Sequence, residues 1–123
     1  MKQVSLDLIQ SIGQAIYDKK GFNILAIDVR DVCSFTDFFI IAEGNVEQHV
    51  LGITDTILDQ LGKIGEKPIH MEGTTPGEWV VLDYGEAVIH LFIPFLREKY
   101  QLEKLWSRGK IVDLNLTMGM DRL

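Results

Sequence analysis

The side chains that most often carry chemistry are few in this chain and are spread along it. The histidines, His49, His70 and His90, lie about twenty residues apart, and no cysteine pattern accompanies them, so no zinc motif is present. The sequence motifs G-x-S-x-G, G-x-x-x-x-G-K-[ST] and G-x-G-x-x-G are also absent. His90 falls in an expected strand, where a hydrogen-bonded sheet histidine is a better interpretation than a ligand or a base. The sequence therefore predicts no catalytic residue, no metal site and no cofactor.

The segment "DVRD" is the strongest candidate for an acidic site, because Asp28 and Asp31 could be imagined as metal ligands. Side chains alternate along a strand, so Asp28 and Arg30 project to the same face and can neutralise one another. We prefer this salt-bridge interpretation. Asp83, which stands close to Gly85, is first a turn residue and only second a contact for a basic partner.

The balance of charge argues against nucleic acid as the main partner. The chain carries 18 acidic and 12 basic side chains, a net charge of −6, and its basic residues form no cluster beyond Lys19-Lys20. Phosphate backbones are held by clustered lysines and arginines. We therefore expect little direct nucleic-acid binding. A basic protein is the better-suited partner, because opposite charges steer association.

Length and composition fit one folded domain. The 123 residues are 46% apolar, and Cys33 is the single cysteine, so we expect a reducing compartment and a small buried thiol. No apolar run approaches the roughly 18 residues that cross a bilayer. The start, "MKQVSLDLIQ", has neither the apolar block of a signal peptide nor an Arg-rich transit segment. These features predict a cytoplasmic chain without membrane contact.

Apolar spacing predicts two amphipathic helices in the first half of the chain. The first is expected over residues 5–20, with Ser5 as N-cap and Gly21 as a left-handed stop. The second is expected to start at Asn45, which can form a capping box with Gln48, and to carry an apolar stripe as far as Gly65.

Strands are expected between and after these helices, at 23–30, at 37–44, near "KPIHME" and in a hairpin within 78–94. Pro94 suits the first turn of a helix, so "FLREKYQLEKLW" should form one helix or a bent pair of short helical pieces. The tail, 107–123, is either an added edge strand or a disordered extension. The order α-β-β-α-β-β-β-α predicts an α/β or α+β domain, a mixed sheet with flanking helices.

The hairpin "EWVVLDYGEAVIHLFIP" is apolar on both faces. A three-residue loop, Asp83-Tyr84-Gly85, is preferred because it places positive φ on glycine alone. Trp79 would then face Ile89, and Trp79, Val81, Ala87, Ile89 and Leu91 would share one surface. Helices can cover much of this sheet. A patch left open near Trp79 and Tyr84 would be a docking surface.

Two long segments resemble the Iojap or ribosomal silencing factor family. The first, "DKKGFNILAIDVRDVCSFTDFFIIAEGN", has the Asp-x-Arg-Asp step and the Thr-Asp-Phe-Phe strand. The second, "EGTTPGEWVVLDYGEAVIHLFIPFLREKYQLEKLW", has Leu-Asp-Tyr-Gly, Val-Ile-His-Leu-Phe and Leu-Glu-Lys-Leu-Trp in the same order. The resemblance covers about residues 5–106 and suggests a domain over 1–106. Glu43 and Val46 depart from the Ser and Ser or Thr expected near them, and the tail after Trp106 is longer.

The resemblance implies a function and a contact set. Members of the family bind the large ribosomal subunit on its conserved ribosomal protein numbered fourteen, block joining of the small subunit and repress translation under nutrient limitation. Their fold is similar to that of nucleotidyltransferases, without the catalytic motif. The partner-binding residues expected by this analogy are Trp79, Asp83, Tyr84, Glu86, His90, Arg97 and Tyr100. For Trp79 a core position, and for Arg97 an ordinary helix-surface charge, remain alternatives.

Two other classes of function stay open at this point. One is a nucleotidyltransferase-like enzyme that would hold Mg²⁺ on Asp28, Asp31 or Asp37, although the opening Gly-Ser motif of such enzymes is missing. The other is a homodimeric structural or adaptor module whose aromatic patch pairs only with itself. A homodimer of the free chain is also compatible with the ribosome-binding interpretation, because a dimer could open onto the partner.

Overall fold

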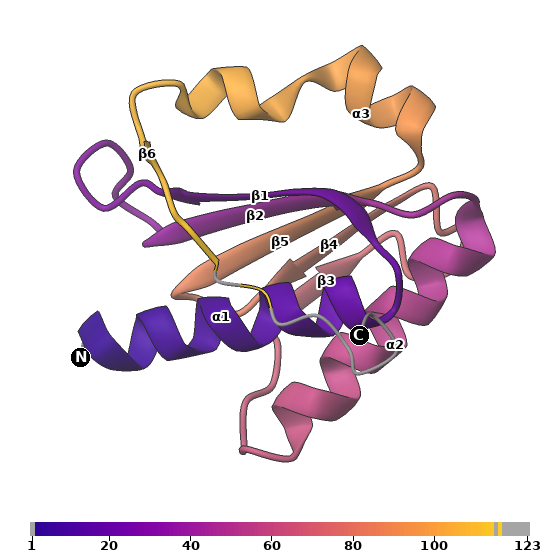
Figure 1. The fold of residues 1–123 in the computed structure, drawn as a ribbon, viewed down its shortest axis with the longest axis horizontal. Coiled ribbons are helices and arrows are strands. Elements are labelled where there is room, and N and C mark those ends of the chain that lie inside the picture. The colour runs from indigo at the N-terminus through magenta and orange to yellow at the C-terminus, as the bar shows by residue number, and fades with distance from the viewer. Residues whose placement is uncertain (1, 115, 117–123) are drawn as a thin grey trace, which may run out of the picture.

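The computed structural model describes residues 2–114 and residue 116, and it shows one mixed sheet with helices on both faces (Figure 1). The helices are α1 (Lys2–Asp18), α2 (Glu47–Gly62), α3 (Pro94–Tyr100) and the short 3₁₀ helix η1 (Leu102–Trp106). The strands are β1 (Phe22–Asp28), β2 (Phe38–Glu43), β3 (His70–Glu72), β4 (Trp79–Asp83), β5 (Ala87–Phe92) and β6 (Lys110–Ile111). The expected α/β class with a mixed sheet is confirmed, as is the bent pair of helical pieces after Pro94.

The six strands lie in the order β3-β4-β5-β2-β1-β6. Only β2 and β5 run parallel among these neighbours, and the other pairs are antiparallel. Strands β5 and β2 are the two middle strands of this order, and they carry the most buried side chains: every residue of β2 is buried. This matches the continuous apolar run "FFIIA", because a strand covered on both faces has no polar side.

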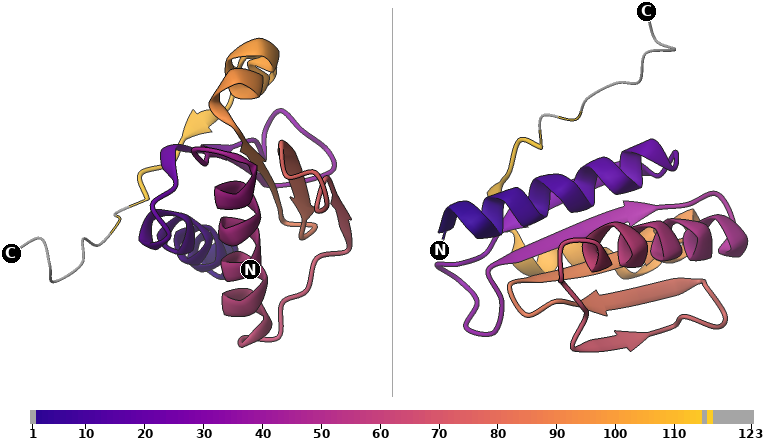
Figure 2. Two further views of the ribbon diagram at one scale, coloured as in Figure 1. Left: turned by 90° about the vertical axis from the view of Figure 1, so that its right-hand side faces the viewer. Right: turned by 90° about the horizontal axis from the view of Figure 1, so that it is seen from below.

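The two faces of the sheet are covered unequally. Helices α1 and α2 lie against each other on one face, and α3 and η1 lie on the other (Figures 1 and 2). Fully buried side chains of both helices meet the sheet on the first face, including Ile12, Ile53 and Ile57. Side chains alternate between the faces along β1: Ala26 belongs to this core, whereas Ile27 and, just after the strand, Val29 belong to the smaller cluster on the second face.

Both expected boundaries of α1 need correction. The helix begins at Lys2, so Ser5 lies inside it rather than at its cap. The left-handed residue after the helix is Lys20, with φ 69°, and Gly21 is not left-handed. Glycine is required at 21 for space, because a Cβ there would lie 2.4 Å from Cγ2 of Ile16.

The expected capping box of α2 is also wrong. The N-cap residue is Val46, and no side chain caps the helix. The backbone N–H of Asn45 donates instead to Nδ1 of His49 at 2.9 Å, and Nε2 of His49 lies 2.8 Å from the carbonyl oxygen of Lys19. His49 thereby ties the start of α2 to the end of α1. A hydrogen bond across the fold has replaced the local one that the sequence suggested.

The hairpin register differs from the expected one. Gly85 has the expected positive φ, 85°. Its N–H donates to Oδ1 of Asp83 at 2.8 Å, which is the hydrogen bond expected of an aspartate in a turn. However, Trp79 pairs with Phe92 rather than Ile89, a shift of three residues. An odd shift moves every β4 side chain to the other face. Val80 and Leu82 therefore face α1 and α2, and Trp79 and Val81 lie on the second face.

The start of the tail forms a short edge strand. Residues Lys110–Ile111 of β6 pair antiparallel with Asp28 and Ile27 of β1, and the N–H of Val112 donates to Ala26. Residue 115 and residues 117–123 lie outside the described part of the chain. Within that part, no helix combines the length and the apolar character needed to cross a bilayer.

Two glycines offer a matched test of the backbone. At Gly73, with φ 75°, a Cβ would lie 1.9 Å from the carbonyl oxygen of Trp79, whereas at Gly52, within α2, nothing lies within 4 Å. We expect Gly73→Ala to lower the free energy of unfolding by at least about 2 kcal/mol, from strain and overlap. We expect Gly52→Ala to raise it by up to about 1 kcal/mol, because alanine is the better helix former. Urea unfolding measures both, and equal effects would contradict the described turn.

Candidate functional site

The second face of the sheet carries a connected group of aromatic rings at β4 and β5. Trp79 is its centre: its ring centroid lies 4.9 Å from that of Phe92, 5.0 Å from that of Tyr100 and 6.0 Å from that of His90. The ring of Phe39 continues the group at 5.7 Å from His90, and Phe35 meets Phe39 edge-on at 6.2 Å. We call these six residues the aromatic surface. Such contacts add to the stabilisation that area burial alone provides.

The strand pairing positions these rings. Trp79 stands opposite Phe92, and Val81 stands opposite His90, so the residues share one face across the hairpin. His90 in turn stands beside Ile41 of the parallel strand β2. Tyr100 lies in the last turn of α3, and Phe35 lies in the loop that connects β1 and β2. Residues far apart in sequence are thus gathered on one side of the sheet.

His90 and Trp79 are joined by a hydrogen bond that fixes their orientation. The Trp79 Nε1–H donates to Nδ1 of His90 over 3.1 Å. Burial lowers the pKa of His90 to about 4, so the imidazole is neutral near pH 7. A neutral ring that accepts at Nδ1 carries its proton on Nε2. The expected sheet histidine is confirmed, and its hydrogen-bond partner is a tryptophan of the neighbouring strand.

Part of the aromatic surface is open. Phe39 and Phe92 are buried, and Trp79 and His90 are half-buried, whereas Tyr100 is 46% exposed and Phe35 66% exposed. Segment α3–η1 lies over the part of the sheet nearer β1, and in the described part of the chain no helix covers the outer side of β3 and β4 (Figure 2). The hairpin is apolar on both faces because one face is sealed by helices α1 and α2 and the other is partly covered and partly open.

Acidic groups lie at one end of the open part, whereas at the other end the ammonium of Lys99 lies 5.5 Å from the centroid of the Tyr100 ring. Asp83 ends β4 opposite His70 of β3, and it shares a face with Trp79 and Val81 because side chains alternate along a strand. Glu72 accepts a hydrogen bond at 2.7 Å from Nε2 of His70 when that nitrogen carries a proton. Glu86 is half-buried in the turn. An apolar centre with a charged rim is the usual anatomy of a protein-binding surface.

The structure corrects the expectation for Tyr84. This side chain is not raised by the turn: it is 7% exposed, belongs to the core under α1 and α2, and makes no hydrogen bond from its hydroxyl within the described residues. Burial raises its pKa to about 12, with a further contribution from Glu66. The three-residue register shift explains the error, because the residue after Asp83 follows Val80 and Leu82 to the inner face.

Arg97 is also placed differently from a surface contact. Its side chain is 12% exposed, and its guanidinium lies 3.3 Å from Glu43 and 3.5 Å from Glu103. Arg97 therefore joins α3 to the edge of β2. Of the expected contacts, the structure brings Trp79, His90 and Tyr100 into one cluster, with Asp83 and Glu86 in the adjoining turn.

Three rings of the aromatic surface were not among the expected contacts: Phe35, Phe39 and Phe92. Phe35 could have been suspected, because a phenylalanine in the polar connection "DVCSFT" has little reason to be buried. Val81, which packs on the same face, follows from strand alternation beside Trp79, and only its pairing with His90 needed the correct register. Cys33, expected as a buried thiol, is partly exposed and packs near the same face.

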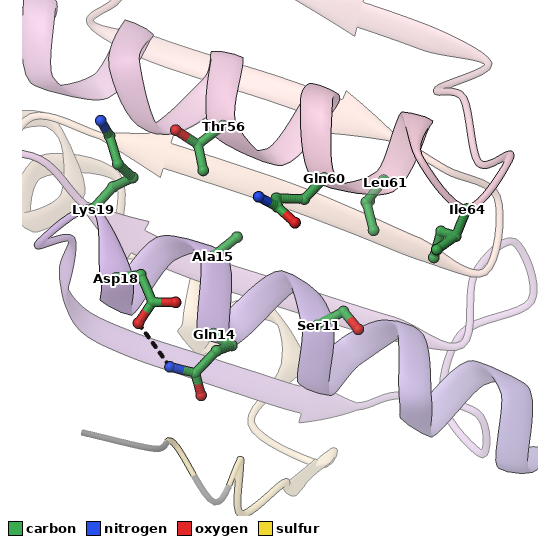
Figure 3. Close-up of a pocket in the computed structure, with 9 residues that line it drawn as sticks. All are labelled: Ser11, Gln14, Ala15, Asp18, Lys19, Thr56, Gln60, Leu61 and Ile64. Atoms are coloured by element: carbon green, nitrogen blue, oxygen red, sulfur yellow. Dashed lines mark hydrogen bonds between the residues drawn. The ribbon is translucent and has the colours of Figure 1, made fainter. Parts of the chain in front are cut away.

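The described residues offer no alternative site with assembled chemistry. They contain no group of three or more potential metal ligands. Asp28 binds Arg30, whose Nε lies 2.9 Å from Oδ1, and this partner lowers the pKa of Asp28, so the salt-bridge interpretation is confirmed. A cavity of about 460 Å³ between α1 and α2 is lined by polar side chains such as Ser11, Thr56 and Gln60 and by apolar ones such as Leu61 (Figure 3). There Gln14 donates to Asp18 at 2.8 Å, and no nucleophile is paired with a base.

A mixed α/β sheet with one sealed face and one partly open aromatic face is the arrangement of a domain that can offer its open face to a protein partner. Comparison with known proteins gives the family. The family model described as "Ribosomal silencing factor during starvation" matches residues 2–121. A Bacillus subtilis protein, "Ribosomal silencing factor RsfS", is 34% identical over 112 residues, which cover 91% of this chain and 95% of the relative. A crystal structure of a Chromobacterium violaceum protein has a TM-score of 0.80 at 26% identity and covers 95% of this chain and 97% of its own.

The chain therefore belongs to the ribosomal silencing factor family. Proteins of this family are non-enzymatic regulators of translation that bind the ribosome. The resemblance found in the sequence is confirmed, as is the interpretation that the protein is not an enzyme.

The buried histidine predicts a pH dependence. The pKa of His90 is about 4 when folded and near 6.5 when unfolded, so the unfolded chain binds the extra proton between these values. The stability from neutral His90 should be complete above pH 6.5 and be lost as the pH falls towards 4, by on the order of 2 kcal/mol. His90→Asn keeps an acceptor for Trp79 and should flatten this part of the pH profile in urea unfolding. His70→Asn, at an exposed site, is the control, and an unchanged profile in His90→Asn would contradict the assignment.

Proposed function

We propose that this chain binds the large ribosomal subunit through its conserved ribosomal protein fourteen and sterically blocks joining of the small subunit, so that translation is repressed when nutrients are limited. The observation that carries the proposal is the partly open aromatic surface with acidic groups at its β3–β4 end, on a member of the ribosomal silencing factor family. The word "starvation" in the family's description supports the condition under which the protein acts.

The chemistry of the surface supports a basic protein partner. Trp79 and Tyr100 are the kind of large side chains that anchor interfaces, because they bury much area at little cost in conformational entropy. Asp83, Glu72 and Glu86 can meet lysine or arginine side chains at the rim. The net charge of −6 adds long-range attraction to a ribosomal protein and repulsion from bare RNA phosphates.

The proposed mechanism is exclusion rather than turnover. A folded domain that occupies the joining face of the large subunit prevents the small subunit from making its contacts there. The degree of repression then follows mass action, and it depends on the concentration of the protein relative to its dissociation constant. No chemical step is needed, which agrees with a family of non-enzymatic regulators.

The proposed contact residues are Trp79, Asp83, Glu86, His90 and Tyr100, to which we add Phe35 for its exposure and Val81 for its place on the same face. Trp79 and His90 serve both core and surface, since each is half-buried. Tyr84 and Arg97 are not proposed as direct contacts. Tyr84 is 7% exposed and packs in the core beside the turn. The Arg97 side chain is 12% exposed and binds Glu43.

The remaining finer features belong to the same proposal. The protein acts in the cytoplasm, and its nucleotidyltransferase-like topology is a scaffold without the catalytic motif. The free chain pairs with itself through the same aromatic surface. The domain boundary at Trp106 stays a prediction, although the family match runs to residue 121 and β6 begins the tail.

A charge change at the turn tests the proposed surface. Asp83→Asn keeps the acceptor for the Gly85 N–H and removes the charge, whereas Asp83→Lys reverses it. We expect co-sedimentation with purified large subunits to weaken about threefold for Asp83→Asn and at least about tenfold for Asp83→Lys, because a basic partner is then repelled. Higher salt should weaken the wild type more than either variant.

The matched control is Asp55→Lys, an equal charge reversal on the exposed side of α2, beyond the sealed face. It should bind like the wild type. Equal binding by Asp83→Lys would show that the site lies elsewhere. A wild-type chain that fails to co-sediment with large subunits would reject the proposed function as a whole.

A further inference from the structure

Arg97 occupies an unusual position for a residue of a short surface helix. Its side chain is 12% exposed, and the Glu43 side chain facing it is 9% exposed. NH1 of Arg97 lies 3.3 Å from Oε2 of Glu43 and also donates to the backbone carbonyl of Asn23, while Nε lies 3.5 Å from Glu103. Nδ2 of Asn23 donates to the same Glu43 oxygen at 3.1 Å. One guanidinium thus joins β1, β2, α3 and η1.

Among the described side chains of segment 94–106, which are those of residues 94–104, few others attach it to the sheet. Helix α3 has seven residues, and none of them is buried. A helix this short is not stable by itself, so its position depends on its tertiary contacts. Leu96 and Leu102 pack on the second face of the sheet as partly buried residues, and Arg97 supplies the polar attachment.

Two residues that hydrogen-bond with Arg97 have an unusual backbone conformation. Asn23 has φ 52° and Gln101 has φ 47°, both in the left-handed region that non-glycine residues seldom adopt. Gln101 is the C-cap of α3: its N–H still donates to the carbonyl oxygen of Arg97 at 2.9 Å, and its left-handed backbone ends the helix directly after Tyr100. Tyr100 therefore leaves α3 at a fixed point, with its ring 5.0 Å from that of Trp79.

We propose that Arg97 is a positioning residue for the aromatic surface: its contacts with Glu43, Glu103 and the Asn23 carbonyl hold α3 and η1 so that Tyr100 stays packed on Trp79. This inference rests on the proposed function, because it assigns the partner contact to Tyr100 and its placement to Arg97. Lysine cannot replace the forked guanidinium, since a single ammonium group does not reach several acceptors with fixed geometry.

The first test needs only the free protein. In Arg97→Met, the amide protons of segment 94–106 should exchange at least about tenfold faster than in the wild type, while those of β2 and β5 keep their rates. The nuclear Overhauser contacts between the Tyr100 and Trp79 rings should weaken as well. Lys104→Met, which removes a positive charge from an exposed position of η1, is the control and should change neither signal. Unchanged exchange in Arg97→Met would overturn the proposal.

The second test measures coupling between Arg97 and Tyr100. We expect Tyr100→Ala to weaken co-sedimentation with large subunits about tenfold, and Arg97→Met to weaken it by a similar factor. If Arg97 acts through Tyr100, the double variant should be no more than about threefold weaker than either single variant. Arg97→Lys should recover only part of the loss. Independent effects, which would multiply to about a hundredfold, would overturn the positioning role.

Two other results, a variant that does not fold and a wild type that does not bind, can be told apart from failure of the positioning role. Removal of Arg97 leaves Glu43 buried without its cation, so Arg97→Met can fail to fold. The variant Glu43→Gln with Arg97→Met removes both charges, keeps an acceptor for Asn23 and is the substitute in both tests. If wild-type chain does not bind large subunits, the proposed function fails, and the exchange and ring-contact measurements still decide whether Arg97 places Tyr100.

Discussion

The pairing of β4 with β5 decides what each apolar side chain of the hairpin does. With Trp79 opposite Phe92, the inner residues Val80 and Leu82 complete the core under α1 and α2. The same register sends Trp79 and Val81 to the other face, where the Trp79 indole can reach His90. A slip by one residue would exchange these two sets and leave neither face coherent. The sealed core and the aromatic surface are therefore two consequences of one register.

The two faces of the sheet are covered unequally, so the aromatic side chains on one of them remain accessible to a partner. Two long helices seal one face, whereas a seven-residue helix and a short 3₁₀ helix are the helices on the other face within the described part of the chain (Figure 1). Tyr100 and Phe35 stay exposed there, in a family whose members bind the ribosome. Exposed aromatic area costs free energy in water, so a surface of this kind is best explained by a partner that covers it.

Buried polar groups organise this surface without necessarily touching a partner. Neutral His90 orients Trp79, and Arg97 with Glu43 holds the segment that carries Tyr100. A buried ion pair adds little stability compared with apolar packing, but it tolerates few geometries. His49 plays a comparable role between the ends of α1 and α2. On the second face, directional bonds thus add fixed geometry to the apolar packing of the smaller cluster.

The sequence by itself determined the α/β class, the order of the elements, the apolar stripes of α1 and α2, the Asp28–Arg30 pair, the turn at Gly85 and the family. These features are set by neighbours within a few residues or by long matched segments. Only the tertiary structure decided the hairpin register, the burial of Tyr84 and Arg97, and the gathering of Phe35, Trp79 and Tyr100. An apolar strand with two similar faces gives no local signal for its pairing, since either register buries greasy side chains. That choice is made by the helices and strands that the two faces must meet.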